Sequence, residues 1–224
     1  MNWGAVIVAA GRGTRFGRPK QLIEIGGRPM LAWSLQTFAS VPEIASIVVV
    51  TERDWIEDVR ALGTRLAPDR NVRVVVGGAT RQESVRCGLD ALPSDCNAVL
   101  IHDGARPLVR GDDVRAGMRE VRPGRAAVLA APVVDTIKVV DPQTMLVRRT
   151  LERSELWAAQ TPQFAMRDAL LRAHDAAAAE ELQATDDVAL LEAIGIEVVV
   201  VPSSGENFKV THPGDIARAQ GFLS

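Results

Sequence analysis

The sequence predicts an α/β protein with a mostly parallel β-sheet covered by helices. Short β-branched runs recur along the chain, and stretches with apolar residues at helical spacing separate them, which is the pattern of β–α–β units. Some runs, such as Ile47-Val48-Val49-Val50, are apolar without interruption. Such strands have both faces buried, as parallel strands beneath helices do.

The order of the elements follows from these patterns. The first strand starts at Ala5 and ends in glycine. Further strands are predicted at residues 44–51, 72–76, 98–102, 126–133 and 197–201. Helices are predicted at residues 29–38, 55–66, 112–121, 165–181, 188–194 and 213–223. Thr185 and Asp186 are suited to begin the helix at 188–194, and the polar segment 157–164 is predicted as a turn.

The composition indicates one globular domain covering residues 1–224, without a repeat or a linker. The longest apolar runs are far too short to span a bilayer. A formal net charge of -2 gives no electrostatic basis for binding nucleic acid. The N-terminus has no basic segment before its apolar run, so we expect a cytoplasmic protein with no membrane partner.

The cysteines and histidines do not form a metal or nucleophile motif. Cys87 and Cys96 lack zinc-ligand spacing and are expected to be reduced thiols. The histidines at positions 102, 174 and 212 are scattered, and none stands in a motif with a serine or cysteine nucleophile.

A phosphate-binding loop is predicted where the first strand ends. Gly11 and Gly13 lack a Cβ and let backbone N–H groups approach an anion closely. Four cations stand beside them, namely Arg12, Arg15, Arg18 and Lys20. A single phosphate needs fewer, so a polyphosphate is the expected ligand. The alternative is a strand-to-helix turn whose glycines serve geometry only.

Two known phosphate loops are excluded. A Walker A loop requires a Gly-Lys pair, which this chain lacks. A dinucleotide fingerprint requires Gly-x-Gly-x-x-Gly, whereas the next glycine after Gly13 is Gly17, one position too late.

Polar residues also follow two later strands, at the edge where open α/β sheets bind ligands. Gly77 and Gly78 would let a base lie flat against the backbone, with Ser84 as a polar contact. Arg81 could reach a phosphate or only help a helix begin, and the alternative for this junction is an ordinary turn. Asp103 is suited to hold Mg²⁺ or a ribose hydroxyl, and its alternative role is to cap a turn.

The pattern changes between residues 133 and 155. Two strand-like pieces, at 136–140 and 146–151, indicate an antiparallel hairpin that leaves the sheet. Exposed hairpins pair readily with other chains, so we expect a partner subunit to cover it. Arg148, Arg149 and Arg153 make it basic. A flap packed on its own domain is the alternative.

These features together suit nucleotidyl transfer. A substrate phosphate would attack the α-phosphorus of a nucleoside triphosphate, and pyrophosphate would leave. Cations from the first loop and from the late Lys209 would hold the charge on the phosphoryl oxygens. No side-chain nucleophile is needed.

An ordered set of motifs extends this interpretation. The motifs are Ala9-Ala10-Gly11-x-Gly13-x-Arg15, Pro19-Lys20-Gln21, Gly77-Gly78-x-x-Arg81-x-x-Ser84-Val85, His102-Asp103-x-Ala105-Arg106-Pro107, Asp135-Thr136-Ile137-Lys138, Thr161-Pro162-Gln163, Thr185-Asp186 and Lys209-Val210-Thr211. In this order the chain resembles the 2-C-methyl-D-erythritol 4-phosphate cytidylyltransferases of the non-mevalonate isoprenoid pathway. The resemblance implies a Rossmann-like three-layer sandwich with a twisted sheet and a projecting β-arm. It also implies transfer of CMP from CTP to a sugar-alcohol phosphate, with Mg²⁺ or another divalent cation.

The resemblance implies residue roles as well. The catalytic positions are Arg15, Lys20 and Lys209. The CTP-binding positions are Ala9, Ala10, Gly11, Gly13, Thr14, Arg15, Lys20, Gly77, Gly78, Arg81, Ser84, Asp103 and Ala105. The substrate-binding positions are Asp103, Arg106, Thr136, Arg153, Thr161, Thr185 and Lys209, and Asp103 is also the metal candidate. Residues 133–155 would form a dimerisation arm that carries Thr136 and Arg153 into the neighbouring subunit's site.

Two departures and two alternatives accompany the resemblance. Ala79 stands where relatives often carry an acidic or polar residue, so a base contact there would use the backbone. Arg12 and Arg18 match no family position. A ribitol 5-phosphate cytidylyltransferase shares most of the motifs. A non-catalytic nucleotide-binding module is the alternative from another class, and the presence of Lys20, Asp103 and Lys209 together argues against it.

Overall fold

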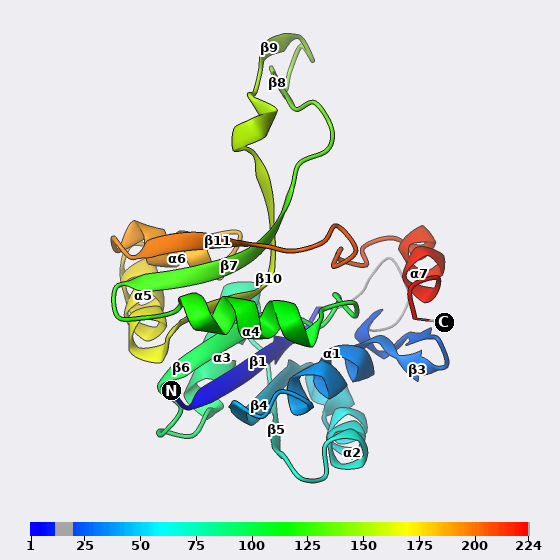
Figure 1. The fold of residues 1–224 in the computed structure, drawn as a ribbon. Coiled ribbons are helices and arrows are strands. Elements are labelled where there is room, and N and C mark those ends of the chain that lie inside the picture. Colours follow the sequence, from blue (N-terminus) through cyan, green and yellow to red (C-terminus); the bar gives the residue numbers. More distant parts are fainter. Residues whose placement is uncertain (12–19, 224) are drawn as a thin grey trace.

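A seven-stranded β-sheet forms the centre of the computed structural model, which describes residues 1–11 and 20–223 (Figure 1). For Lys20 only the backbone is described. The strand order is β11-β7-β10-β6-β1-β4-β5. The strands are β1 (Trp3–Val8), β4 (Ile44–Thr51), β5 (Asn71–Val76), β6 (Ala98–Asp103), β7 (Arg125–Pro132), β10 (Trp157–Met166) and β11 (Glu197–Pro202).

Most neighbouring strands of this sheet are parallel, as predicted. Only β10 runs antiparallel to its two neighbours, β6 and β7, among the strands described. Strand β1 lies between β4 and β6, and Val8 is in register with Val50 on one side and Asp103 on the other. The carboxyl ends of these three strands therefore reach one edge of the sheet, where ligands bind in open α/β folds.

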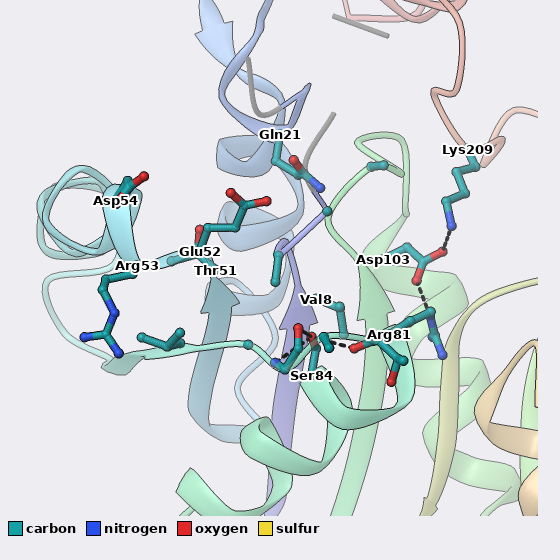
Figure 2. Close-up of a pocket in the computed structure, with 18 residues that line it drawn as sticks. Val8, Gln21, Thr51, Glu52, Arg53, Asp54, Arg81, Ser84, Asp103 and Lys209 are labelled. Atoms are coloured by element: carbon teal, nitrogen blue, oxygen red, sulfur yellow. Dashed lines mark hydrogen bonds and ion pairs between the residues drawn. The ribbon is translucent and has the colours of Figure 1, made fainter. Parts of the chain in front are cut away.

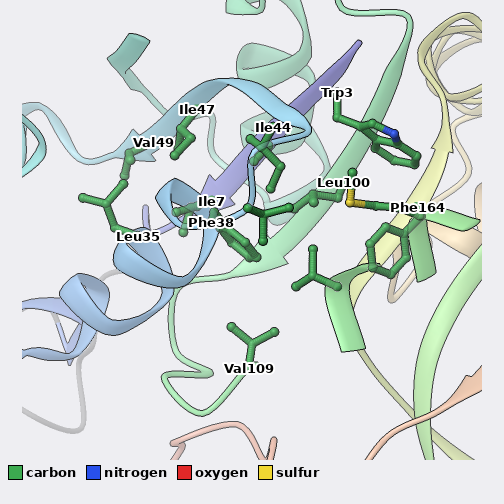
Figure 3. Packing of buried hydrophobic residues seen from close by; sticks show 14 of the residues in the cluster. Trp3, Ile7, Leu35, Phe38, Ile44, Ile47, Val49, Leu100, Val109 and Phe164 are labelled. Carbon is green, nitrogen blue, oxygen red and sulfur yellow. The ribbon is translucent and has the colours of Figure 1, made fainter. Parts of the chain in front are cut away.

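Helices pack on both faces of the sheet, which confirms the three-layer architecture. They are α1 (Met30–Ala39), α2 (Ile56–Leu66), α3 (Arg81–Ala91), α4 (Gly111–Glu120), α5 (Arg167–Ala179) and α6 (Asp187–Ala193). A further helix, α7 (Pro213–Gln220), packs in a separate small cluster with Ile25 and Met30. Successive residues of β1 point to opposite faces. Ile7 packs with Leu35 and Phe38 of α1 on one face (Figure 3), whereas Val6 packs with Val85 and Leu89 of α3 on the other.

The predicted turn at residues 157–164 is wrong, because this segment lies within strand β10. The polar side chains that suggested a turn are buried and hydrogen-bonded inside the protein. Gln163 accepts hydrogen bonds from the backbone N–H groups of Asp187 and Val188. Gln160 accepts one from the side chain of Asn207, 3.0 Å away. The pairing of β10 with β7 also shifts register between Ala159 and Gln163, so no simple alternation of apolar residues marks the strand.

Two smaller hairpins flank the main sheet. The predicted antiparallel excursion is confirmed as β8 (Lys138–Val140) and β9 (Val147–Thr150), which project far from the body of the protein in Figure 1. A second hairpin, β2 (Glu24–Ile25) with β3 (Arg28–Pro29), was not predicted from the sequence. Each of its strands is only two residues long, which leaves too little sequence for a recognisable pattern.

Among the described residues, no helix is long and apolar enough to cross a membrane. Cys87 and Cys96 are both free thiols, as predicted. Burial raises the pKa of the Cys96 thiol, and so does the nearby Asp95. Burial and a raised pKa agree with a structural role for Cys96.

Candidate active site

A cavity of about 520 Å³ opens at the carboxyl ends of β1, β4, β5 and β6 (Figure 2). Its volume is in the range that small-molecule ligands occupy. The predicted site residues that line it are Ala10, Gly11, Gly77, Gly78, Arg81, Ser84, Asp103, Ala105 and Lys209. Ala9 is different, because its side chain is buried in the hydrophobic core instead.

The β5–α3 junction forms the floor of this cavity and requires glycine. A Cβ on Gly77 would lie 2.5 Å from the Cβ of Ala10, and one on Gly78 would lie 2.3 Å from the Cβ of Glu83. The Ser84 hydroxyl braces the same junction, since it accepts a hydrogen bond from the N–H of Gly78 and donates one to the carbonyl oxygen of Thr80. The floor is therefore backbone that a flat base can approach closely.

A network of four charged groups forms one wall of the cavity. Arg81 donates from Nε to Asp103 Oδ1 at 3.0 Å and from an Nη atom to Asp187 Oδ2 at 2.8 Å. Lys209 Nζ lies 2.8 Å from the other Asp103 oxygen. Arg81 is thus paired with two carboxylates and is not available to bind phosphate. Asp187 was not predicted as a site residue, and only its position beside Asp186 at a helix start could have drawn attention to it.

The charges in this network reinforce one another. Burial would raise the pKa of Asp103, but Arg81 and Lys209 outweigh burial and hold it well below its usual range. Burial would lower the pKa of Arg81, but Asp187 and Asp103 raise it. The formal charges of the two cations and two carboxylates in this network nearly cancel. Excess positive charge for a triphosphate must come from elsewhere along the cavity.

Lys209 reaches this wall because the segment after β11 is fixed to the centre of the molecule. The N–H of Val210 donates to the carbonyl oxygen of Ala105 at 2.8 Å. Arg106 donates to the carbonyl oxygen of Asn207 at 2.7 Å. Asn207, which is 1% exposed, donates in turn to the Thr161 carbonyl oxygen on β10. Residues far apart in the sequence thus converge on the end of β6.

A second cavity of about 240 Å³ lies on the other side of the charged wall. Arg81, Asp103 and Lys209 line both cavities. The predicted substrate-binding residues Arg106, Thr161 and Thr185 line only this second one. Two ligands placed in the two cavities would therefore meet at the shared wall.

His102 links the strands that carry these residues. Its Nε2 lies 3.1 Å from the Arg106 carbonyl oxygen, which can only accept, so Nε2 carries the proton. Its Nδ1 must then accept from the Thr161 hydroxyl at 3.0 Å, and that hydroxyl accepts from the N–H of Asp103. Burial lowers the pKa of His102 to about 4, so the ring is neutral near pH 7.

Some predicted residues lie outside these cavities or outside the described part of the chain. Thr136 and Arg153 are exposed on the projecting hairpin and line neither cavity. Gly13, Thr14 and Arg15 fall in the segment that the structure does not describe, and so do Arg12 and Arg18. The side chain of Lys20 is likewise outside the described atoms.

The residues present do not form a protein-held metal site. The described part of the chain contains no group of three or more Asp, Glu, His or Cys residues placed to hold a metal ion. Both oxygens of Asp103, the metal candidate, face cationic side chains. A metal bound to Asp103 would have to compete with Arg81 and Lys209.

Fold and site together define a nucleotidyltransferase-type protein. A Rossmann-like sheet places a backbone-lined cavity and a second, smaller cavity on either side of one wall of paired charges, which suits a nucleotide and an acceptor that react with each other. Comparison with known proteins gives the family. Residues 4–224 match the model of the 2-C-methyl-D-erythritol 4-phosphate cytidylyltransferase family, and the chain belongs to it.

Individual relatives are similar to this chain over nearly its whole length. The enzyme of that name from Halalkalibacterium halodurans is 42% identical, over 100% of this chain and 98% of its own length. The one from Streptomyces coelicolor is 45% identical, over 98% of this chain and 84% of its own. The crystal structure of 4-diphosphocytidyl-2C-methyl-D-erythritol synthase from Anaerococcus prevotii has a TM-score of 0.87 and 31% identity, covering 99% of this chain and 97% of that one. These findings confirm the resemblance identified from the motifs.

Proposed function

We propose that this chain transfers CMP from CTP to 2-C-methyl-D-erythritol 4-phosphate, giving 4-diphosphocytidyl-2-C-methyl-D-erythritol and pyrophosphate. The observation that carries the proposal is the pair of cavities that share Arg81, Asp103 and Lys209. A nucleotide in the larger cavity and a phosphorylated sugar alcohol in the smaller one would bring their phosphates together at this wall. The relatives' names support methylerythritol phosphate over ribitol 5-phosphate as the acceptor.

The residue roles follow from this placement and from the family resemblance. The base lies on the backbone of Gly77 and Gly78, and the triphosphate extends toward Gly11 and the loop that follows it. Arg15 and Lys20 neutralise the triphosphate, and Lys209 acts from the opposite side. Their charges are most valuable when the α-phosphorus is five-coordinate and its oxygens carry extra negative charge.

The acceptor occupies the smaller cavity. Arg106 supplies positive charge for its phosphate, and Asp103 and Thr185 supply polar contacts for its hydroxyl groups. Asp103 also keeps Lys209 at the boundary between the two ligands, since its carboxylate is 2.8 Å from the ammonium group. The Thr161 hydroxyl is already used by His102 and Asp103, so Thr161 positions the wall rather than binding the acceptor through its hydroxyl.

A divalent cation, Mg²⁺ or another, accompanies CTP in this proposal. Its ligands would be mainly phosphate oxygens, because the described residues offer no carboxylate cluster for it. When bound, it neutralises triphosphate charge. The protein's own contribution is Lys209 at the shared wall and the cationic loop.

The projecting arm, residues 133–155, is proposed to pair with a second copy of the chain. Its apolar side chains are unusually exposed: Val134 is 80%, Met145 69% and Leu146 69% exposed. Apolar residues this exposed indicate a surface that another protein covers. Thr136 and Arg153 lie on this arm and would complete the acceptor cavity of the partner. Residues 1–224, with this arm included, form a single nucleotidyltransferase domain.

The test is pyrophosphate release in three parallel reactions. The protein, CTP and Mg²⁺ are incubated with methylerythritol phosphate, with ribitol 5-phosphate or with no acceptor. We expect release that depends on methylerythritol phosphate. Release with ribitol phosphate alone would contradict the proposed acceptor. If none of the three reactions releases pyrophosphate although the protein binds CTP, the protein is a non-catalytic nucleotide-binding module.

A further inference from the structure

Asp187 is a buried carboxylate that lies behind the charged wall. Its Oδ2 is 2.8 Å from an Nη atom of Arg81, its side chain is 2% exposed, and it lines neither of the two cavities. Its Oδ1 lies 3.8 Å from Nε2 of His174, which is beyond hydrogen-bonding distance. Arg81 is therefore its nearest cationic partner among the described residues. Any effect of Asp187 on a ligand has to pass through Arg81.

Asp187 is held in place by strand β10 and by the start of α6. Its backbone N–H donates to Gln163 Oε1 at 2.8 Å, and Gln163 Nε2 donates to Asp186 Oδ2 at 2.9 Å. Gln163 belongs to β10 and is 3% exposed, so these contacts fix the start of α6 against the sheet. The Asp186 carboxylate also accepts from the N–H of Ala189 and caps α6. The carboxylate of Asp187 is thus a fixed point to which the longer side chain of Arg81 is attached.

Arg81 is the member of the network whose position depends on this contact. Its side chain is 27% exposed and lines both cavities, so ligands on either side can reach it. Asp103 is a single carboxylate, yet it contacts both Arg81 and Lys209 (Figure 2). Without Asp187, one positive charge in the network would be unbalanced. The planar guanidinium, which suits phosphate oxygens, would then be attracted away from Asp103 to the nearest phosphate.

We propose that Asp187 is a positioning residue, which keeps Arg81 on Asp103 and off the phosphates, so that Asp103 and Lys209 stay in place for the reaction. The inference rests on the proposed function, because it concerns the reaction across the same wall. It assigns a role to a residue that touches neither ligand and that the motifs did not identify. Loss of Asp187 should therefore strengthen binding of a polyphosphate while slowing the reaction, whereas a merely loosened site would weaken both.

Asp187→Asn tests this role, because it removes the carboxylate with almost no change in shape. Equilibrium binding of pyrophosphate with Mg²⁺ is measured for the wild type and the variant, together with kcat for transfer to methylerythritol phosphate. We expect pyrophosphate to bind about tenfold more tightly, as one new charged hydrogen bond allows. We expect kcat to fall about tenfold to a hundredfold, because the reacting groups are misplaced. Unchanged or weaker pyrophosphate binding would overturn the inference, as would an unchanged kcat.

A second comparison shows whether the effect passes through Arg81. Arg81→Gln is compared with the double variant Arg81→Gln/Asp187→Asn, in which neither charge of the pair remains. Since Asp187 acts only through Arg81, the two proteins should agree within about threefold in kcat and in pyrophosphate affinity. A further large fall in kcat in the double variant would mean that Asp187 acts elsewhere, and it would overturn the inference. This comparison stands even where Asp187→Asn alone does not fold.

Asp175→Asn is the matched control. Asp175 lies on α5 and pairs with Arg86 of α3, the helix that also carries Arg81. Its side chain is 64% exposed and lines neither cavity, so its replacement should change neither kcat nor pyrophosphate binding. Changes equal to those of Asp187→Asn would contradict a specific role for Asp187. Binding of pyrophosphate needs no turnover, so absence of transfer by the wild type would count against the proposed function alone.

Discussion

At the scale of single residues, Asp103 connects three of the predicted site residues. Its carboxylate joins Arg81 to Lys209, and its backbone N–H is held by Thr161. The sequence identified Asp103, Arg81 and Lys209 as site residues from their motifs. It could not show that they bind one another, because ion pairing depends on side-chain distances that only the fold determines.

Replacement of Lys20 by alanine should lower kcat by about two to three orders of magnitude, as loss of a charge contact to a transition state typically does. The reason is the proposed role of Lys20 at the five-coordinate phosphorus. Steady-state kinetics with CTP and methylerythritol phosphate provide the measurement. Arg60→Ala, at an exposed position on α2, is the control for loss of a cation. A Lys20→Ala protein with near-normal kcat would show that Lys20 has no catalytic part.

His102 should make the folded state sensitive to mild acid. Its pKa is about 4 in the folded protein and about 6.5 when unfolded. Between these values the unfolded chain binds a proton that the folded chain does not, so stability is full above pH 6.5 and declines as the pH falls. We expect His102 to account for a loss of about 3 kcal/mol in unfolding free energy from pH 6.5 to pH 4.

Urea unfolding at a series of pH values measures this effect. His102→Gln should be less stable at pH 7 but should have a flatter pH profile over this range. His212→Gln, which retains His102, should keep the wild-type slope. The buried neutral state of His102 would be refuted if His102→Gln and wild type lost stability in parallel.

At the scale of elements, apolar periodicity predicted the strands and helices that are buried through their apolar side chains. The predicted strand at residues 44–51 coincides with β4, and the predicted helix at 55–66 differs from α2 by one residue at its start. Strand β10 could not be predicted in this way. Its buried glutamines are satisfied by α6 and by the segment at Asn207, which are partners that lie far away in the sequence.

Strand β10, which was predicted as a turn, can be tested through its packing against α4. A Cβ on Gly117 of α4 would lie 2.2 Å from the ring of Phe164. Gly117→Ala should therefore reduce the unfolding free energy by about 1–3 kcal/mol. In α7, Gly214 has no atom within 4 Å of an added Cβ, so Gly214→Ala should be neutral or slightly stabilising. Equal stability of the two variants in urea unfolding would contradict the close packing of α4 on β10.

The arm allows a complementation experiment. An Arg153→Ala subunit is mixed with a Lys20→Ala subunit, each nearly inactive alone. If Arg153 acts in the partner's site, each mixed dimer contains one intact site, and random mixing should restore about a quarter of the wild-type sites. Activity assays after subunit exchange measure the recovery. The shared-site proposal fails if the mixture never exceeds the activity of the separate variants although mixed dimers have formed.

At the scale of the whole molecule, the sheet order explains why the site was only partly predictable. β–α–β alternation in the sequence predicted a parallel sheet, and ligand binding at the carboxyl ends of its strands follows from that fold class. The sequence did not predict that β10 inserts between β6 and β7, which brings Thr161 and Gln163 to the end of β6. The second cavity exists because of this insertion, since Thr161 and Gln163 on β10 line it.

The central claim is that ligands in the two cavities react across the shared wall of Arg81, Asp103 and Lys209. Phosphorus NMR of a reaction containing the protein, CTP, Mg²⁺ and methylerythritol phosphate tests it most directly. The predicted result is a pair of coupled diphosphate resonances from the cytidylylated product, together with pyrophosphate. Formation of CMP and pyrophosphate without coupled resonances would mean that water, not the acceptor phosphate, attacks CTP, and it would contradict the claim.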